Sequence, residues 1–170
     1  RTYFLKATHK ILSIIVISQF FCTSLWFAGN GIMNNLSTTF SLPESALGNL
    51  TSAVQFGFIM GTFLFALFTI VDRFSPSRVF FVSAILGALF NGCLILEYQT
   101  IQTLVAYRFF TGFFLAGIYP VGMKIATDYF KNGLGKSLGF LVGALVLGTA
   151  LPHLLKDVLI HFSWRFVIVS

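Results

Sequence analysis

Apolar residues fill most of this chain in long stretches, and polar residues gather in short breaks between them. A helix that crosses the hydrocarbon core of a bilayer, about 30 Å thick, needs about 20 mostly apolar residues. Five stretches are long enough and a sixth begins before the last residue; they are Ile11–Asn30, Ala46–Val71, Val79–Leu96, Ile101–Met123, Ser137–Leu155 and the partial stretch 162–170. The pattern predicts an all-α membrane protein, with five complete transmembrane helices and the start of a sixth in one domain, 1–170. Because the sixth stretch stops at Ser170, we expect the chain to be a fragment.

Composition agrees with a membrane location, and charge adds an orientation. The chain is 56% hydrophobic and 9% charged, whereas charged residues make up about a quarter of a soluble domain. Basic residues in short loops stay on the cytoplasmic side of a membrane. Alternate breaks carry Arg1, Lys6, Lys10, Arg73, Arg78, Lys124, Lys131 and Lys136, and the other breaks carry only Lys156 and Arg165. We expect a multi-pass protein of a bacterial inner membrane with its N-terminus in the cytoplasm, and no nucleic-acid partner despite the net charge of +6.

Two breaks carry helix start signals. Ser41 followed by Glu44 has the spacing of a capping box ahead of the second stretch. Ser75 can cap the helix of the third stretch, and Pro76 suits the first turn of that helix.

One arginine interrupts the fourth apolar stretch. Arg108 lies about seven residues into it, about 10 Å below the outer end of a helix that rises 1.5 Å per residue. An arginine near the centre of a membrane helix costs about 2.5–3.5 kcal/mol, and such residues usually face a protein interior or a wet cavity. At helical spacing it shares a face with Gly112 and Tyr119, and Pro120 predicts a bend. A side chain that reaches outward to water, or that bonds to polar groups of a neighbouring helix, is the alternative.

A polar stripe follows one face of the first stretch. Gln19, Thr23, Trp26 and Asn30 recur at helical spacing among apolar residues, and Gln55 belongs to a similar group in the second stretch. Polar side chains in lipid are unfavourable unless they face a partner helix or water. Hydrogen bonding between helices and the lining of a cavity both explain the stripe.

Motifs in three stretches resemble those of the major facilitator superfamily. Leu104-x-x-x-Arg108-x-x-Thr111-Gly112 is similar to the fourth-helix signature of that superfamily. The loop DRFSPSR, which begins with Asp72 and Arg73, resembles its cytoplasmic loop between helices two and three, without the two glycines of the pattern. Gly139-x-x-x-Gly143 resembles the fifth-helix pattern of its proton antiporters, but the proline of that pattern is absent.

The resemblance implies the N-terminal six-helix bundle of a secondary transporter that moves a small solute by alternating access, with the C-terminal half absent. Its partners would be the lipid bilayer, a small-molecule substrate, a coupling ion and that missing half, and we expect no cofactor. The expected cavity residues are Gln19, Thr23, Trp26, Asn30, Gln55, Arg108 and Tyr119, and the expected gating residues are Asp72, Arg73 and Arg78. Arg108 suggests an anionic substrate. A carboxylate for ion coupling is not found in the apolar stretches, since Glu44, Asp72, Glu97, Asp128 and Asp157 all fall at their ends or between them.

Two other classes of protein compete with a transporter. An enzyme is disfavoured, because His9, His153 and His161 lie near membrane edges and no catalytic, metal-binding or phosphate-binding motif is found. A receptor or assembly subunit that uses the same fold without transport is the second alternative. Water access to the polar stripe of the first helix would separate these classes.

Overall fold

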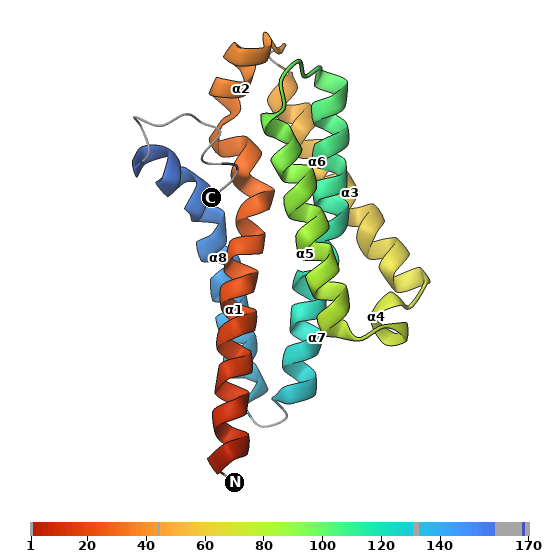
Figure 1. Ribbon diagram of the computed structural model, residues 1–170, viewed down its shortest axis with the longest axis vertical. Helices are drawn as coiled ribbons and strands as arrows, with labels where there is room; N and C mark the ends of the chain where they lie inside the picture. The colour runs from red at the N-terminus through yellow and green to blue at the C-terminus, as the bar shows by residue number, and fades with distance from the viewer. Residues whose placement is uncertain (1, 44, 131–132, 159–167, 169–170) are drawn as a thin grey trace.

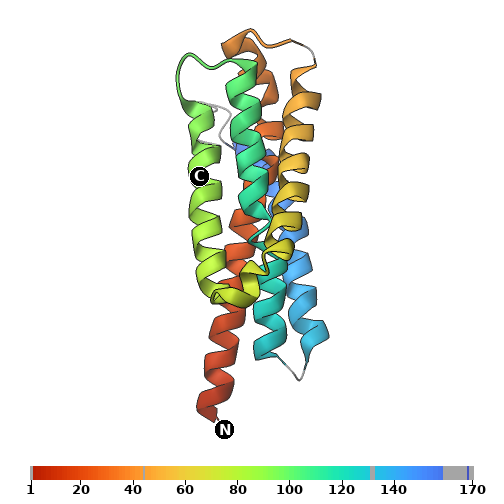
Figure 2. The ribbon, with the colours of Figure 1, turned by 90° about the vertical axis from the view of Figure 1, so that its right-hand side faces the viewer.

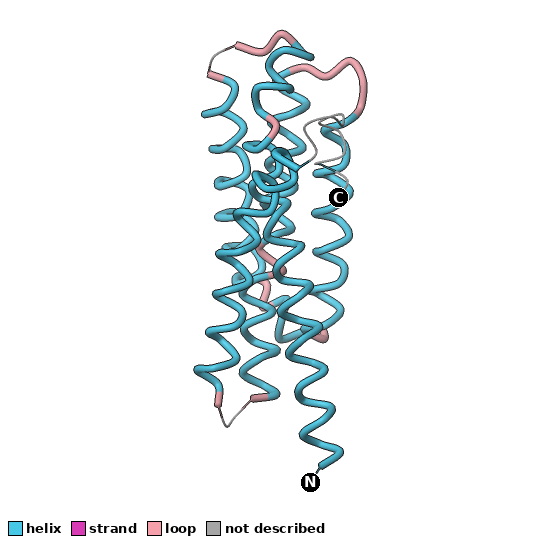
Figure 3. Tube along the Cα trace, turned by 90° about the vertical axis from the view of Figure 1, so that its left-hand side faces the viewer, coloured by secondary structure: helices cyan, strands magenta, loops and turns pink. Residues whose placement is uncertain are grey.

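The computed structural model describes residues 2–43, 45–130, 133–158 and 168, with only the backbone at 2–9, 27–31, 33–34, 152–153 and 155–158. The described part is helical and contains no strand (Figures 1 and 3). Its elements are α1 (Thr2–Gly31), α2 (Met33–Phe40), α3 (Ala46–Leu67), α4 (Ile70–Arg73), α5 (Pro76–Gly92), η1 (Cys93–Ile95), α6 (Ile101–Leu115), α7 (Tyr119–Tyr129) and α8 (Leu134–Val158).

The predicted fold class is confirmed. Within the described residues, four stretches are long and apolar enough to cross a membrane, and Lys10–Trp26 is a shorter apolar helix; the four are Ala46–Leu67, Pro76–Ile95, Ile101–Tyr129 and Leu134–Leu151. The predicted sixth stretch lies outside the described residues apart from Ile168. Helix α2 was not predicted, because its sequence is mostly polar and only Leu36 of its described residues is fully buried.

The helices form an elongated bundle. The start of α1, α4, the end of α7 and the start of α8 lie toward one end, and α2 and the loop between α5 and α6 lie at the other (Figures 1 and 2). Helix α3 packs mainly against α6, α1 against α8, and α5 against α6 and α7. The loops with most of the basic residues therefore share one end, as expected of alternating spans.

Glycines bring α3 and α6 together. A Cβ at Gly57 would collide with the main-chain oxygen of Phe109, and one at Gly61 with that of Phe113. From the opposite side, a Cβ at Gly112 would collide with the main-chain oxygen of Val54. Small residues are the usual means by which membrane helices approach closely. The spacing Gly57-x-x-x-Gly61 is thus a packing surface between two helix backbones.

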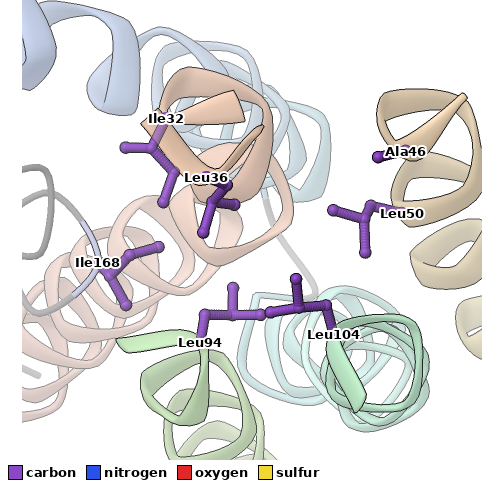
Figure 4. Packing of buried hydrophobic residues seen from close by; sticks show 7 residues of the cluster. All are labelled: Ile32, Leu36, Ala46, Leu50, Leu94, Leu104 and Ile168. Carbon is purple, nitrogen blue, oxygen red and sulfur yellow. The ribbon is translucent and has the colours of Figure 1, made fainter. Parts of the chain in front are cut away.

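Two apolar clusters lie toward the two ends of the bundle. The cluster near α2 joins Ile32, Leu36, Ala46, Leu50, Leu94, Leu104 and Ile168 (Figure 4). The cluster toward the N-terminal end joins residues of α1, α5, α7 and α8, among them Ile15, Val79, Val121 and Leu141. Gln19 on α1, Asn91 on α5 and Arg108 on α6 each lie, along the chain, between a residue of one cluster and a residue of the other.

The fourth predicted span is interrupted. Helix α6 ends at Leu115, turns follow at residues 116–118, and α7 begins at Tyr119 with Pro120 in its first turn. Proline has no N–H to donate to the carbonyl of residue 116 and its ring crowds the preceding turn. The interruption lies just before Pro120, the residue from which a bend was predicted.

Helix caps differ in part from the sequence signals. Ser41 ends α2 in a left-handed conformation (φ 50°), and Ser45 precedes α3, so the capping box assigned to Ser41 and Glu44 was wrong for Ser41; Glu44 is outside the described residues. Ser75 does precede α5 and Pro76 opens it, although the Ser75 side chain makes no capping hydrogen bond. A capping box that was not predicted joins Thr100 and Thr103 at the start of α6.

Candidate functional site

Arg108 bonds to the main chain of a neighbouring helix. Its side chain is 1% exposed; Nη1 donates to the carbonyl oxygen of Leu25 at 3.0 Å, and Nη2 donates to that of Trp26. Nη1 also lies 3.4 Å from Oδ1 of Asn91 on α5, which is completely buried. Arg108 therefore links α6 to α1 and α5. The sequence left three positions open for the Arg108 side chain: facing a cavity, reaching outward to water, or bonding to a neighbouring helix. The structure shows the third.

The arginine leaves part of its hydrogen-bonding capacity unused. Nε of Arg108 and Nδ2 of Asn91 are buried and have no hydrogen-bond partner in the described structure. The carbonyl oxygens of α1 spread part of the arginine's positive charge, because a main-chain carbonyl carries a partial negative charge and two lone pairs. The described ion pairs do not include Arg108.

A cavity of about 280 Å³ lies beside the second half of α1. Its lining comes from α1, α3, α6, α7 and α8 and consists of Gln19, Thr23, Trp26, Phe58, Leu115, Ile118, Tyr119, Leu145 and Thr149. Trp26 and Phe58 meet edge to face, with their ring centroids 5.2 Å apart. Helical periodicity explains the contribution of α1, because residues at i, i+4 and i+7 share one face.

Four of the residues expected in a cavity line it together: Gln19, Thr23, Trp26 and Tyr119. Arg108 and Gln55 are not among the lining residues, and Gln55 is exposed on α3. The side chain of Asn30 lies outside the described part.

Sequence reasoning missed five residues of the lining, which are Phe58, Leu115, Ile118, Leu145 and Thr149. Thr149 is a polar residue in an apolar span, and its spacing of four from Leu145 was the signal that could have placed both on one face. Phe58 gave no signal, because an aromatic side chain suits a lipid-facing position as well as a cavity.

A local hydrogen-bond pair organises the polar wall of the cavity. Thr23 Oγ1 donates to the main-chain oxygen of Gln19 at 2.7 Å, and Gln19 Nε2 donates to Thr23 Oγ1 at 3.3 Å. The side chain of Gln19 is 1% exposed, and its Oε1 has no hydrogen-bond partner within the described chain. A Cβ added at Gly122 of α7 would lie 3.3 Å from that oxygen.

The expected gating residues lie at the N-terminal end of the bundle. Asp72 of α4 forms an ion pair with Lys124 of α7. Arg73 and Arg78 are exposed. From the sequence, Lys124 was identified only as one of the basic residues that indicate orientation in the membrane. Lys124 and Asp72 are 52 residues apart, and no sequence pattern indicates that residues at this separation meet. The pair connects the break between α3 and α5 to α7, the second part of the interrupted span.

The described residues include no group of three or more His, Cys, Asp or Glu side chains that could hold a metal ion. The residues that line the cavity offer shape, aromatic surface and hydrogen-bonding groups.

Comparisons with known proteins agree with this architecture. The family model of the Major Facilitator Superfamily matches residues 15–170. The chain is 25% identical over 168 residues to the uncharacterized transporter YgaY of Escherichia coli O157:H7, and it has the same identity to YgaY of Escherichia coli strain K12. Each alignment covers 95% of this chain and 42% of the relative, so the chain spans about two fifths of the length of the curated relatives that it matches. The chain is an integral membrane protein and belongs to the Major Facilitator Superfamily.

Proposed function

We propose that the full-length protein is a secondary transporter that moves a small solute across a bacterial inner membrane by alternating access. In this proposal the chain is its N-terminal bundle, with the N-terminus in the cytoplasm, and a second bundle completes the path. The observation that carries the proposal is the cavity lined by Gln19, Thr23, Trp26 and Tyr119. In transporters built from repeated bundles, substrates bind near the middle of the membrane where the bundles meet.

Asp72 and Lys124 supply the proposed inner gate. Their side chains are 68% and 36% exposed, so water screens the pair and its formation changes the free energy by less than about 1 kcal/mol. A weak pair suits a gate, because it breaks at small cost when the two bundles change their relative position. Arg73 and Arg78 remain free to contact the second bundle or lipid headgroups in this proposal.

Thiol labelling from each side of the membrane tests alternating access without knowledge of the substrate. Thr149→Cys, in full-length protein freed of its other cysteines, places a thiol in the cavity, and Ile59→Cys is the control, since Ile59 is 62% exposed on α3. A membrane-impermeant thiol reagent should reach Thr149→Cys in both right-side-out and inside-out vesicles, and should leave Ile59→Cys unmodified in lipid.

Labelling of Thr149→Cys from one side only, or from neither side, would contradict alternating access. That result would favour the non-transporting module that uses the same fold. Asp72→Asn should change the ratio of labelling from the two sides, because it weakens the inner gate.

A further inference from the structure

We propose that a groove between α1 and α8 binds one anionic phospholipid, with its headgroup at Lys136 and an acyl chain on the apolar wall of the groove. The groove has a volume of about 520 Å³ and lies at the end of the bundle where α8 begins. It is separate from the central cavity, because no residue lines both. The proposal therefore does not depend on the transport function.

The apolar wall of the groove comes from three segments. Leu12, Val16 and Ile17 of α1, Phe130 after α7, and Phe140 of α8 form it. Ile17 is 57% exposed and Phe140 is 49% exposed, so the described residues leave much of this wall uncovered. Burial of apolar surface is favourable in proportion to its area, and a hydrocarbon chain supplies that burial.

The polar residues of the groove lie nearer the end of the bundle than the apolar wall. On α8, Lys136 lies one turn before Phe140, and on α1, Ser13 lies one turn before Ile17. Ser137 adds a second hydroxyl. A phospholipid has the same order, with a polar headgroup followed by apolar chains, so each part of the lipid would meet a matching part of the groove.

The level of these polar residues in the membrane also suits a headgroup. The apolar segments that border the groove begin at Lys10 on α1 and at Leu134 on α8, and the starts of both helices lie toward the same end of the bundle (Figure 1). In a bilayer this is the level at which the hydrocarbon core ends and the headgroups begin. A lysine at this level extends its ammonium group toward the headgroups.

The charges around the groove favour an anionic lipid over a neutral one. The residues that line it include one ammonium group, that of Lys136, and no carboxylate. Lys10, just before the apolar part of α1, is also exposed. Asp72 and Asp128 are not among the lining residues. Basic pockets between membrane helices bind anionic headgroups, and the partial positive charge at the start of α8 adds to the attraction.

A free anion would use only part of the groove. Inorganic phosphate could meet the ammonium group and the two hydroxyls, but it would leave the apolar wall without a partner. An acyl chain attached to the phosphate covers that wall as well. The occupant that fits both parts of the groove is therefore a lipid.

Fluorescence quenching of a tryptophan in the groove tests the proposal. Phe140→Trp is made in full-length protein freed of its other tryptophans and reconstituted in mixtures of phosphatidylglycerol and phosphatidylcholine, with brominated acyl chains on one of the two lipids. One basic residue changes the affinity for an anionic lipid about 5-fold, so brominated phosphatidylglycerol should quench Phe140→Trp with an apparent affinity about 5-fold higher than brominated phosphatidylcholine. Phe63→Trp is the control, since Phe63 is 57% exposed on α3 outside the groove, and it should show little preference.

Charge variants of the Phe140→Trp protein identify the group that selects the lipid. Lys136→Gln should remove the preference for phosphatidylglycerol, and Lys136→Arg should keep it, because the positive charge is retained. Lys156→Gln is the matched control, since it removes the same charge near the opposite end of α8. It should leave the preference unchanged, whereas a preference that survives Lys136→Gln would refute the role of Lys136.

Three further outcomes would overturn the proposal. Equal quenching of Phe140→Trp by the two lipids would refute selection of an anionic lipid. No quenching by either lipid would show that another part of the full-length protein covers the groove. Loss of the preference in excess inorganic phosphate, but not in sodium chloride of equal ionic strength, would assign the polar residues to a free anion.

Discussion

Gly112 of α6 lies against the main-chain oxygen of Val54 of α3, so close that no side chain fits between the two helices. Gly112→Ala should therefore force the helices apart, because a backbone atom cannot turn aside as a side-chain tip can. We expect a loss of about 1–3 kcal/mol in stability, the usual effect of overpacking, measured as a lower melting temperature of the full-length protein in detergent.

Gly48→Ala is the control for this substitution. Gly48 lies in α3, and a Cβ there would have no neighbouring atom within 4 Å. Because alanine is the better helix former, the melting temperature should stay constant or rise slightly. Equal losses from Gly112→Ala and Gly48→Ala would contradict the close contact.

Arg108→Lys should weaken the connection between α6 and α1. An ammonium group cannot reach the carbonyl oxygens of Leu25 and Trp26 with the planar fork of a guanidinium, although the charge is retained. The loss should be about 1.5–3 kcal/mol, the usual contribution of a hydrogen bond to a charged group. This loss would be measured as a lower melting temperature. Amide hydrogen exchange should also become faster in the part of α1 that follows Trp26.

Arg78→Lys provides the comparison for Arg108→Lys, since Arg78 is exposed on α5. It should leave both melting and exchange unchanged. If Arg108→Lys behaved like Arg78→Lys, the bonds to α1 would contribute nothing to the fold.

Asp72→Asn should alter the conformational balance more than the stability. The exposed pair with Lys124 contributes less than about 1 kcal/mol, so the melting temperature should barely move. The ratio of inward- to outward-facing protein, measured by thiol labelling from each side, should shift toward the state open at the gate. Exchange of the two charges in the double variant Asp72→Lys/Lys124→Asp should restore the ratio, and failure to restore it would argue against a direct pair.

Thr100→Ala should destabilise α6 by about 0.5–2 kcal/mol, since it removes the hydroxyl that accepts the Thr103 N–H in the capping box. Thr127→Ala is the matched control, because the Thr127 hydroxyl bonds to the main-chain oxygen of Lys124 within its own helix and caps no terminus. A thermal melt that ranks the two variants equally would exclude a capping role for Thr100.

Helix positions could be predicted from the sequence because they depend on local features. The long apolar stretches, Pro76 at the start of α5 and Pro120 at the interruption between α6 and α7 all act through neighbouring residues. The stripe of Gln19, Thr23 and Trp26 was equally local, since one helix places all three on one face. Helix α2 was missed because the burial of Leu36 depends on residues far along the chain.

Partners across helices could not be predicted in this way. The orientation of Arg108 toward α1 depends on how closely α6 approaches it, and the pair of Asp72 with Lys124 depends on the turn at residues 116–118. Phe58 lines the cavity and Phe63 is exposed, yet the sequence around them is apolar in both cases. Which apolar face of a helix meets lipid depends on how that helix packs against the others. The sequence of one helix does not specify this packing.

Arg108 holds α1 by main-chain oxygens, which every amino acid possesses, and this has an evolutionary consequence. Substitutions at positions 25 and 26 can change the side chains of α1 without removing the acceptors of Arg108. The wall of the cavity at Trp26 can therefore diversify under selection for new ligands while the joint between α1 and α6 is inherited unchanged. One scaffold can in this way give rise to carriers with different preferences, because the residue that anchors the helix and the residue that meets the ligand are under separate constraints.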